Sequence, residues 1–175
     1  MSLVTSKEML LDAQKGGYAV GAFNAENMEM VKAIIAAAEE LKAPVMIQTT
    51  PSTINYGTLE TYTALVRAEA QKASVPVALH LDHGNSFELA VRAIREGYTS
   101  IMIDGSGSDF EGNIDVTRRV VAVAAPNQIP VEAELGKVGG KEDDLEAEAD
   151  TNTDPAQAAE FVERTGISSL AVAIG

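Results

Sequence analysis

The segment HLDHG, residues 80 to 84, contains the only two histidines of the chain, with an aspartate between them. It ends the apolar run PVALHLD, whose side chains would alternate between two faces in a β-strand. His80 and Asp82 would then share one face, and His83 would lie just past the strand. A neutral imidazole is a common metal ligand, and an adjacent carboxylate can act as a base. The pattern allows metal binding at His83 and proton transfer at Asp82, while His80 is more simply a hydrogen-bonded interior histidine.

Other polar residues stand at the ends of further apolar runs. Asp104 ends TSIMID and Glu134 ends IPVEAE, and each could bind a metal or be a buried acid that backbone donors satisfy. Asn24, Gln48 and Thr50 end two earlier runs, where they could line a substrate cleft or cap local loops. The chain has no cysteine, so any metal would have nitrogen and oxygen ligands.

Six short runs rich in β-branched residues are the elements that must position these side chains. Amphipathic helical stretches separate them; Val31, Ile35 and Ala38, for example, fall on one helical face. The alternation predicts βα units and a parallel sheet. The six predicted strands cover residues 19–23, 44–50, 76–82, 99–104, 129–134 and 169–175.

Helix boundaries carry recognisable capping residues. Ser86 and Asn113 are candidate N-caps, and Asp154 with Pro155 is typical of an N-cap followed by the first helical residue. Gly97 and Gly166 stand where C-cap glycines are expected.

Two α/β architectures fit this order of elements. A doubly wound sheet requires a glycine-rich phosphate turn after the first strand, but AVGAFNAEN places Asn24 and Glu26 there. A (βα)8 TIM barrel predicts polar residues at the carboxyl ends of successive strands, as found here. A closed barrel takes about 250 residues. We therefore expect residues 1–175 to form the N-terminal part of a single barrel domain and to supply six of its βα units.

The composition excludes some classes of partner. The net charge of −13 disfavours binding to nucleic acid or to anionic membranes, which leaves a small molecule or another protein. The N-terminal residues lack a long apolar segment, so neither export nor membrane insertion is predicted. Together with the absence of cysteine, this predicts a cytoplasmic protein.

The segments HLDHG, SIMIDGS and VEAELGKVGGKEDD, in this order and spacing, resemble the class II, zinc-dependent ketose-bisphosphate aldolases. The similarity runs along the whole chain: GYAVGAFNAEN resembles the family's first strand and loop, and DPAQAAEFVERTGISSLAVAIG its segment leading to strand six. Within the family the sequence is most similar to the tagatose-bisphosphate aldolase branch.

The resemblance implies reversible aldol cleavage of a ketose 1,6-bisphosphate, tagatose or fructose, to dihydroxyacetone phosphate and glyceraldehyde 3-phosphate. It implies a Zn²⁺ cofactor with His83 as first ligand, and Asp104 and Glu134 as positions that bind a second or displaced metal. Asp82 matches the family's acid/base aspartate at the C4 hydroxyl. Glu142, in the loop GGKEDD, matches a mobile glutamate that carries the proton at the dihydroxyacetone phosphate carbon.

The same resemblance places Asn24, Gln48 and Thr50 along the cleft for a sugar bisphosphate. We also expect homo-oligomers, because the unpaired edge strands of an unclosed barrel recruit other chains. Two other functions stay open: an aldolase-like protein that binds or assembles without catalysis, and an aldolase for another phosphorylated substrate. A Schiff-base mechanism is disfavoured, because it requires a lysine on a buried strand and all seven lysines fall in predicted helices or loops.

Overall fold

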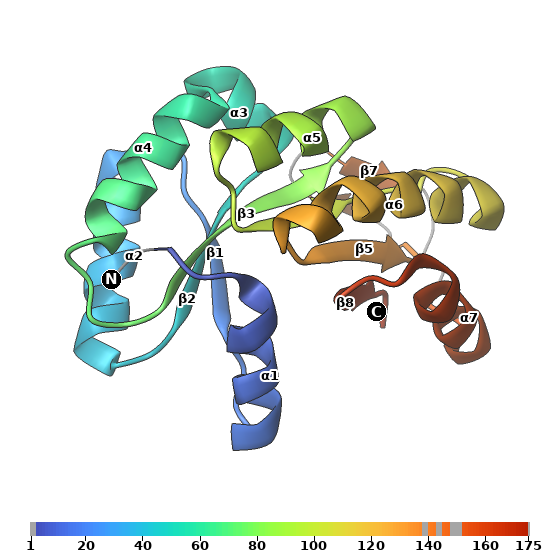
Figure 1. The fold of residues 1–175 in the computed structure, drawn as a ribbon, viewed down its shortest axis with the longest axis horizontal. Coiled ribbons are helices and arrows are strands. Elements are labelled where there is room, and N and C mark those ends of the chain that lie inside the picture. The colour runs from blue at the N-terminus through green and yellow to red at the C-terminus, as the bar shows by residue number, and fades with distance from the viewer. Residues whose placement is uncertain (1–2, 138–139, 143–144, 148–151, 175) are drawn as a thin grey trace.

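A computed structural model describes residues 3–137, 140–142, 145–147 and 152–174, apart from the side chains of 140–142 and 145–147. Six parallel strands form one curled sheet whose spatial order follows the chain (Figure 1). This confirms the predicted parallel α/β fold, an open part of a TIM-type barrel. The strands are β1 (Gly21–Asn24), β2 (Val45–Thr49), β3 (Val77–Gly84), β4 (Ser100–Ile103), β5 (Val131–Leu135) and β8 (Ser169–Val172).

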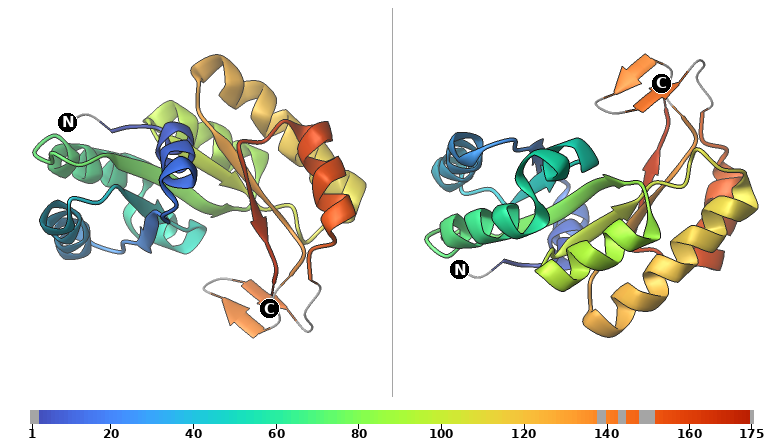
Figure 2. Two further views of the ribbon diagram at one scale, coloured as in Figure 1. Left: turned by 90° about the horizontal axis from the view of Figure 1, so that it is seen from below. Right: turned by 90° about the horizontal axis from the view of Figure 1, so that it is seen from above.

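Helices cover the convex outer side of the sheet, while the first helix lies at the amino ends of the strands (Figure 2). Met9 of that helix forms a small apolar cluster with Met46 and Ala78 inside the curl. A short antiparallel hairpin, β6 (Gly140–Glu142) with β7 (Leu145–Ala147), stands apart from the main sheet. The helices are α1 (Ser6–Gly16), α2 (Met28–Leu41), α3 (Pro51–Gly57), α4 (Leu59–Ala70), α5 (Phe87–Glu96), α6 (Phe110–Ala124), the 3₁₀ turn η1 (Ala125–Asn127) and α7 (Pro155–Thr165).

Most predicted caps are confirmed. The Ser86 side chain accepts a hydrogen bond from the Leu89 amide, and Asp154 caps α7 in the same way. Gly97 and Gly166 end α5 and α7 in the left-handed conformation. The prediction for Asn113 is wrong: Asp109 caps α6, and Asn113 lies one turn inside the helix, where it is buried.

The main core lies between the outer face of the sheet and the helices. Ile47, Leu79 and Ile101 are fully buried on neighbouring strands, and Val31 and Val66 meet them from α2 and α4. Truncating such a buried side chain to alanine lowers the free energy of unfolding by about 2 to 5 kcal/mol. This packed layer therefore holds the strands and helices together.

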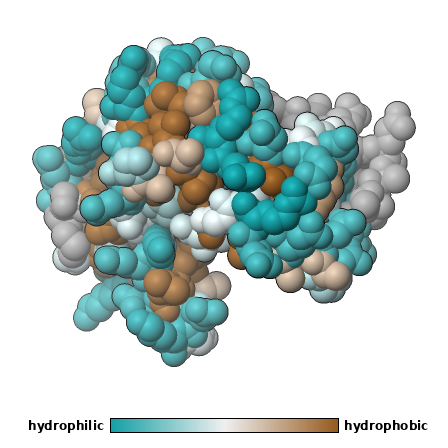
Figure 3. Space-filling model, turned by 45° about the vertical axis from the view of Figure 1, so that its right-hand side comes forward, coloured by the Kyte–Doolittle hydropathy of each residue, from teal (hydrophilic) through white to brown (hydrophobic). Residues whose placement is uncertain are grey.

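β1 and β8 are the outer strands of the sheet, and among the described residues neither pairs on its free side. Apolar side chains are exposed near both edges: Phe23 at 50%, Val172 at 49% and Ile174 at 82%. On the face shown in the space-filling view, hydrophobic patches interrupt the hydrophilic surface (Figure 3). In the described part of the chain no helix combines the length and apolar character that crossing a membrane requires.

Candidate metal centre and active site

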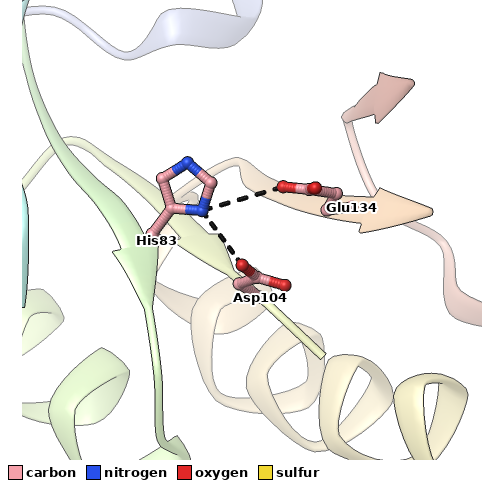
Figure 4. Close-up of side chains that lie close together, drawn as sticks. All are labelled: His83, Asp104 and Glu134. Atoms are coloured by element: carbon pink, nitrogen blue, oxygen red, sulfur yellow. Dashed lines mark hydrogen bonds and ion pairs between the residues drawn. The ribbon is translucent and has the colours of Figure 1, made fainter. Parts of the chain in front are cut away.

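Three predicted site residues meet at the carboxyl ends of adjacent strands. His83 lies near the end of β3, Asp104 directly follows β4, and Glu134 lies on β5. Parallel pairing of β3 with β4 and of β4 with β5 brings the three side chains to one edge (Figure 4). The sequence therefore identified the members of this cluster, and the sheet order explains why they converge.

The geometry of these three residues, here called the triad, fits a metal ion. His83 Nδ1 lies 3.0 Å from Asp104 Oδ2 and 3.7 Å from Glu134 Oε2. One potential ligand atom from each residue falls within 4.8 Å of the other two. The side chains are 16%, 7% and 16% exposed, so a bound ion would keep limited contact with water. One imidazole and two carboxylates form a nitrogen and oxygen donor set that Zn²⁺ accepts.

The carboxylates also control the charge of the imidazole. The hydrogen bond to Asp104 raises the pKa of His83 to about 9, against the effect of burial, and the negative charges of Asp82, Asp104 and Glu134 add to the rise. Burial alone would raise the pKa of Asp104, but hydrogen bonds from His83 and Ser106 outweigh it and the pKa is lowered. The triad without metal is thus an imidazolium held between two carboxylates.

The backbone at His83 is irregular. The register between β3 and β4 shifts between Leu81 and Gly84, and His83 has a φ of 48°. A left-handed conformation at a non-glycine residue costs about 1 to 3 kcal/mol. At Gly84 the strands approach so closely that a Cβ atom would lie 2.5 Å from the Met102 carbonyl oxygen. The bulge turns His83 toward Asp104 instead of letting the side chains of β3 continue to alternate.

Asp82 and Glu132 lie beside the triad. Asp82 is buried at 9% exposure, and its charge contributes to the raised pKa of His83. Burial raises the pKa of Glu132, although its carboxylate accepts a hydrogen bond from Ser169 at 3.3 Å. Sequence reasoning missed Glu132, yet the period of two along β5 places it on the same face as Glu134.

A loop residue and a helix residue support two members of the triad. The Ser106 amide donates to Asp104 Oδ1 at 3.0 Å, so this side chain has two fixed partners, Ser106 and His83. The side-chain amide of Asn113 donates to the Glu134 carbonyl oxygen at 2.8 Å and ties α6 to β5. Asn113 therefore supports the site's backbone rather than capping a helix.

The predicted substrate-lining residues lie on the first two strands or directly after the second. Asn24 and Gln48 are direct partners in the β1–β2 register and are both half-buried. Thr50 is buried and caps α3, where it accepts from the Thr53 amide. The local capping role considered for Thr50 is thus present.

Glu142 ends β6 in the hairpin, whereas the sequence predicted a loop there. Its side chain lies outside the described part of the structure, so its role as a proton carrier stays a prediction.

Comparison with known proteins supports the relationship along the whole chain. The family model for class II fructose-bisphosphate aldolase matches residues 4–175. The chain is 49% identical over 178 aligned positions to a probable fructose-bisphosphate aldolase of Bacillus subtilis, covering 100% of the chain and 62% of that protein. It is 49% identical to a fructose-bisphosphate aldolase of Thermus caldophilus, covering 99% of the chain and 57% of that relative.

Among solved structures, the YdjI aldolase of Escherichia coli K12 superimposes with a TM-score of 0.89 at 44% identity. The match covers 99% of this chain and 62% of that protein. The chain thus spans about three fifths of the length of the relatives it matches.

Proposed function

Because the chain belongs to the class II fructose-bisphosphate aldolase family, we propose that it forms part of a metal-dependent aldolase. The reaction is reversible cleavage of a ketose 1,6-bisphosphate to dihydroxyacetone phosphate and glyceraldehyde 3-phosphate. The observation that carries the proposal is the triad of His83, Asp104 and Glu134 at the carboxyl edge of the sheet, with Asp82 buried beside it. Active sites of TIM barrels lie on this face.

The triad would hold Zn²⁺. When bound, the ion supplies a Lewis acid that favours negative charge on the substrate's carbonyl oxygen. The protein's own contribution is to present one imidazole nitrogen and two carboxylates at the carboxyl ends of three adjacent strands. The Asp104 carboxylate, fixed by Ser106, keeps the imidazole ring of His83 oriented in the absence of metal.

Asp82 is proposed to transfer the proton of the C4 hydroxyl. During cleavage its carboxylate takes this proton while the C3–C4 bond breaks, and during condensation it returns the proton to the new hydroxyl. Its burial at the rim of the sheet excludes bulk water from this exchange. Asn24, Gln48 and Thr50 are proposed to line the cleft for the sugar bisphosphate, tagatose or fructose.

The proposed reaction suggests where the protein acts, and the sheet edges suggest how the chain associates. Sugar bisphosphates are highly charged and stay inside the cell, so the activity implies a cytoplasmic location. In the isolated 175-residue chain, the unpaired β1 and β8 and the exposed Phe23 and Val172 favour association between copies, because unpaired edge strands recruit other chains. Light scattering of purified protein measures the oligomeric state.

The test uses a hybrid protein, here called the chimera. In it, residues 1–175 of this chain replace the matching segment of the Bacillus subtilis relative. We expect cleavage of fructose or tagatose 1,6-bisphosphate, loss of activity with a chelator, and recovery with Zn²⁺. Comparing kcat/KM for the two sugars identifies the substrate. Cleavage of neither sugar by a folded, zinc-loaded chimera would favour another phosphorylated substrate or a binding protein without catalysis.

The affinity of the triad for Zn²⁺ should rise with pH. Since the pKa of His83 is about 9 without metal, Zn²⁺ must displace a proton below that pH. We expect the association constant to increase about tenfold per pH unit up to about pH 9 and then to level off. The measurement is chelator competition on the 175-residue chain, and an affinity independent of pH would contradict the raised pKa.

The stability of the metal-free chain should change in the opposite direction. A pKa raised in the folded state stabilises the fold fully below the ordinary value of 6.5, and this contribution is lost as the pH rises through about 9. Denaturant unfolding with a chelator present measures the free energy of unfolding at pH 6 and pH 9. The contribution of His83 to this free energy should be smaller at pH 9.

Glu142→Gln in the chimera should slow the exchange of a dihydroxyacetone phosphate C–H proton with solvent by about 100-fold or more, because glutamine cannot carry that proton. Binding of dihydroxyacetone phosphate should change by only a few-fold. Deuterium exchange followed by NMR measures the rate. An unchanged exchange rate would assign the step to another residue.

A further inference from the structure

The end of β3 that carries Asp82 and His83 is not held by regular strand pairing. In β3, His80 pairs with Ser100 of β4, and Leu81 pairs with Ile101. The next residue of β3 that pairs with β4 is Gly84, opposite Ile103. Asp82 and His83 fall within this register shift. Contacts on either side of the shift must therefore set their orientation.

Side chains join β3 to β4 on both sides of the shift. On the site side, His83 Nδ1 lies 3.0 Å from Asp104 Oδ2. On the other side, His80 Nδ1 lies 2.7 Å from Ser100 Oγ, and both side chains are buried. The shift is thus enclosed between two histidine contacts, of which only the first belongs to the triad.

The inner contact extends to the first helix. Ser6 Oγ, in the first turn of α1, lies 2.8 Å from Ser100 Oγ. Ser6, His80 and Ser100 are 2%, 1% and 2% exposed. Hydrogen bonds therefore run from α1, across the inside of the sheet, to the strand that bears the site.

His80 has no second anchor in the described part of the chain, because its Nε2 is buried without a hydrogen-bond partner there. Burial lowers the pKa of His80 to about 3, so the ring is neutral at physiological pH. Ser100 is the group that fixes this ring. Apolar side chains of similar size could replace His80 and Ser100 without burying polar atoms. What the hydrogen bond between His80 and Ser100 adds is therefore a defined orientation of the two side chains.

We propose that Ser6, Ser100 and His80 are positioning residues, which hold β3 against β4 below the register shift and so set the geometry of Asp82 and His83. This inference rests on the proposed metal site at the triad. It makes α1 part of the support of the site, although α1 contributes none of the triad's ligands. The sequence predicted a hydrogen-bonded interior role for His80, and the structure connects that role to the site.

The test compares Ser100→Ala and Ser6→Ala with the unmodified 175-residue chain. Ser100→Ala should weaken Zn²⁺ binding about tenfold or more, as loss of residues that support metal ligands does. It should also speed hydrogen exchange of the Asp104 amide, which donates to the Gly84 carbonyl oxygen at 2.9 Å. Ser6→Ala should shift both measurements in the same direction by less, since Ser100 still contacts His80.

A matched control separates positioning from general stability. Thr165→Ala also removes a buried hydroxyl hydrogen bond, but on α7 and away from the register shift. It should lower the melting temperature without changing Zn²⁺ affinity. Ser100→Ala should also alter the visible spectrum of bound Co²⁺. Ser100→Thr keeps the hydroxyl and should retain both the Zn²⁺ affinity and the Co²⁺ spectrum of the unmodified chain.

The outcomes separate this inference from the proposed function. If the unmodified chain binds Zn²⁺ and folded Ser100→Ala and Ser6→Ala keep its affinity, its Co²⁺ spectrum and its Asp104 exchange rate, the positioning role is refuted. If the unmodified chain binds no Zn²⁺ while Ser100→Ala speeds the exchange, the metal site fails and the support of β3 stands.

Discussion

Replacing Asp82 with asparagine in the chimera is expected to lower kcat for bisphosphate cleavage by about 100- to 10,000-fold, the range for removing a general acid or base. Asparagine preserves the size of the side chain but cannot accept the C4 proton. Zn²⁺ content should stay the same, because Asp82 lies beside the triad and is not one of its ligands. Steady-state kinetics and metal analysis on the same preparation measure both quantities.

Asp115→Asn is the matched control, since Asp115 is exposed on α6, outside the site. It should leave kcat within a few-fold of the parent value. Cleavage by Asp82→Asn at a rate close to this control would remove Asp82 from the mechanism. A loss of zinc together with activity would instead make Asp82 part of the metal site.

The second large effect is expected for His83→Ala in the 175-residue chain. The change removes the only imidazole of the triad, so the Zn²⁺ affinity should fall by more than about 100-fold, or about 2.7 kcal/mol. It also leaves Asp104 and Glu134 facing each other without the imidazolium between them. Competition with a fluorescent chelator at pH 8 measures the affinity.

Two controls accompany this variant. Asp115→Asn should bind Zn²⁺ like the parent chain, and circular dichroism should show that His83→Ala stays folded. Affinity within threefold of the parent would mean that the ion binds elsewhere and that the triad is an ion-pair cluster.

The strands and most caps were predictable because each depends on local sequence. β-branched runs bounded by glycine or proline predicted all six strands of the sheet, and Ser86 and Asp154 fit the N-cap pattern. Asn113 was misassigned because a capping asparagine and a buried one look the same in sequence. Its partner, the Glu134 carbonyl, is 21 residues away in the chain.

The site was predictable as a set of residues but not as a geometry. Strand-end polarity and the family resemblance both pointed to His83, Asp104 and Glu134. The positive φ of His83 and the register shift beside it could not be inferred, because they depend on how closely Gly84 packs against β4. Nor could the contact of Ser6 with Ser100, which joins residues 94 positions apart.

The sheet order has a consequence for how the protein is made. Among the six described strands of the main sheet, each strand after β1 pairs with the one before it, so none of these pairings waits for a distant segment. The triad's three residues emerge from the ribosome within one continuous stretch, from His83 to Glu134, at about 5 to 20 residues per second. Two-state mixed α/β domains fold in times between those of helical bundles, about microseconds to milliseconds, and those of all-β domains, about milliseconds to seconds. The metal centre can therefore assemble on the nascent chain, within seconds of the synthesis of β5.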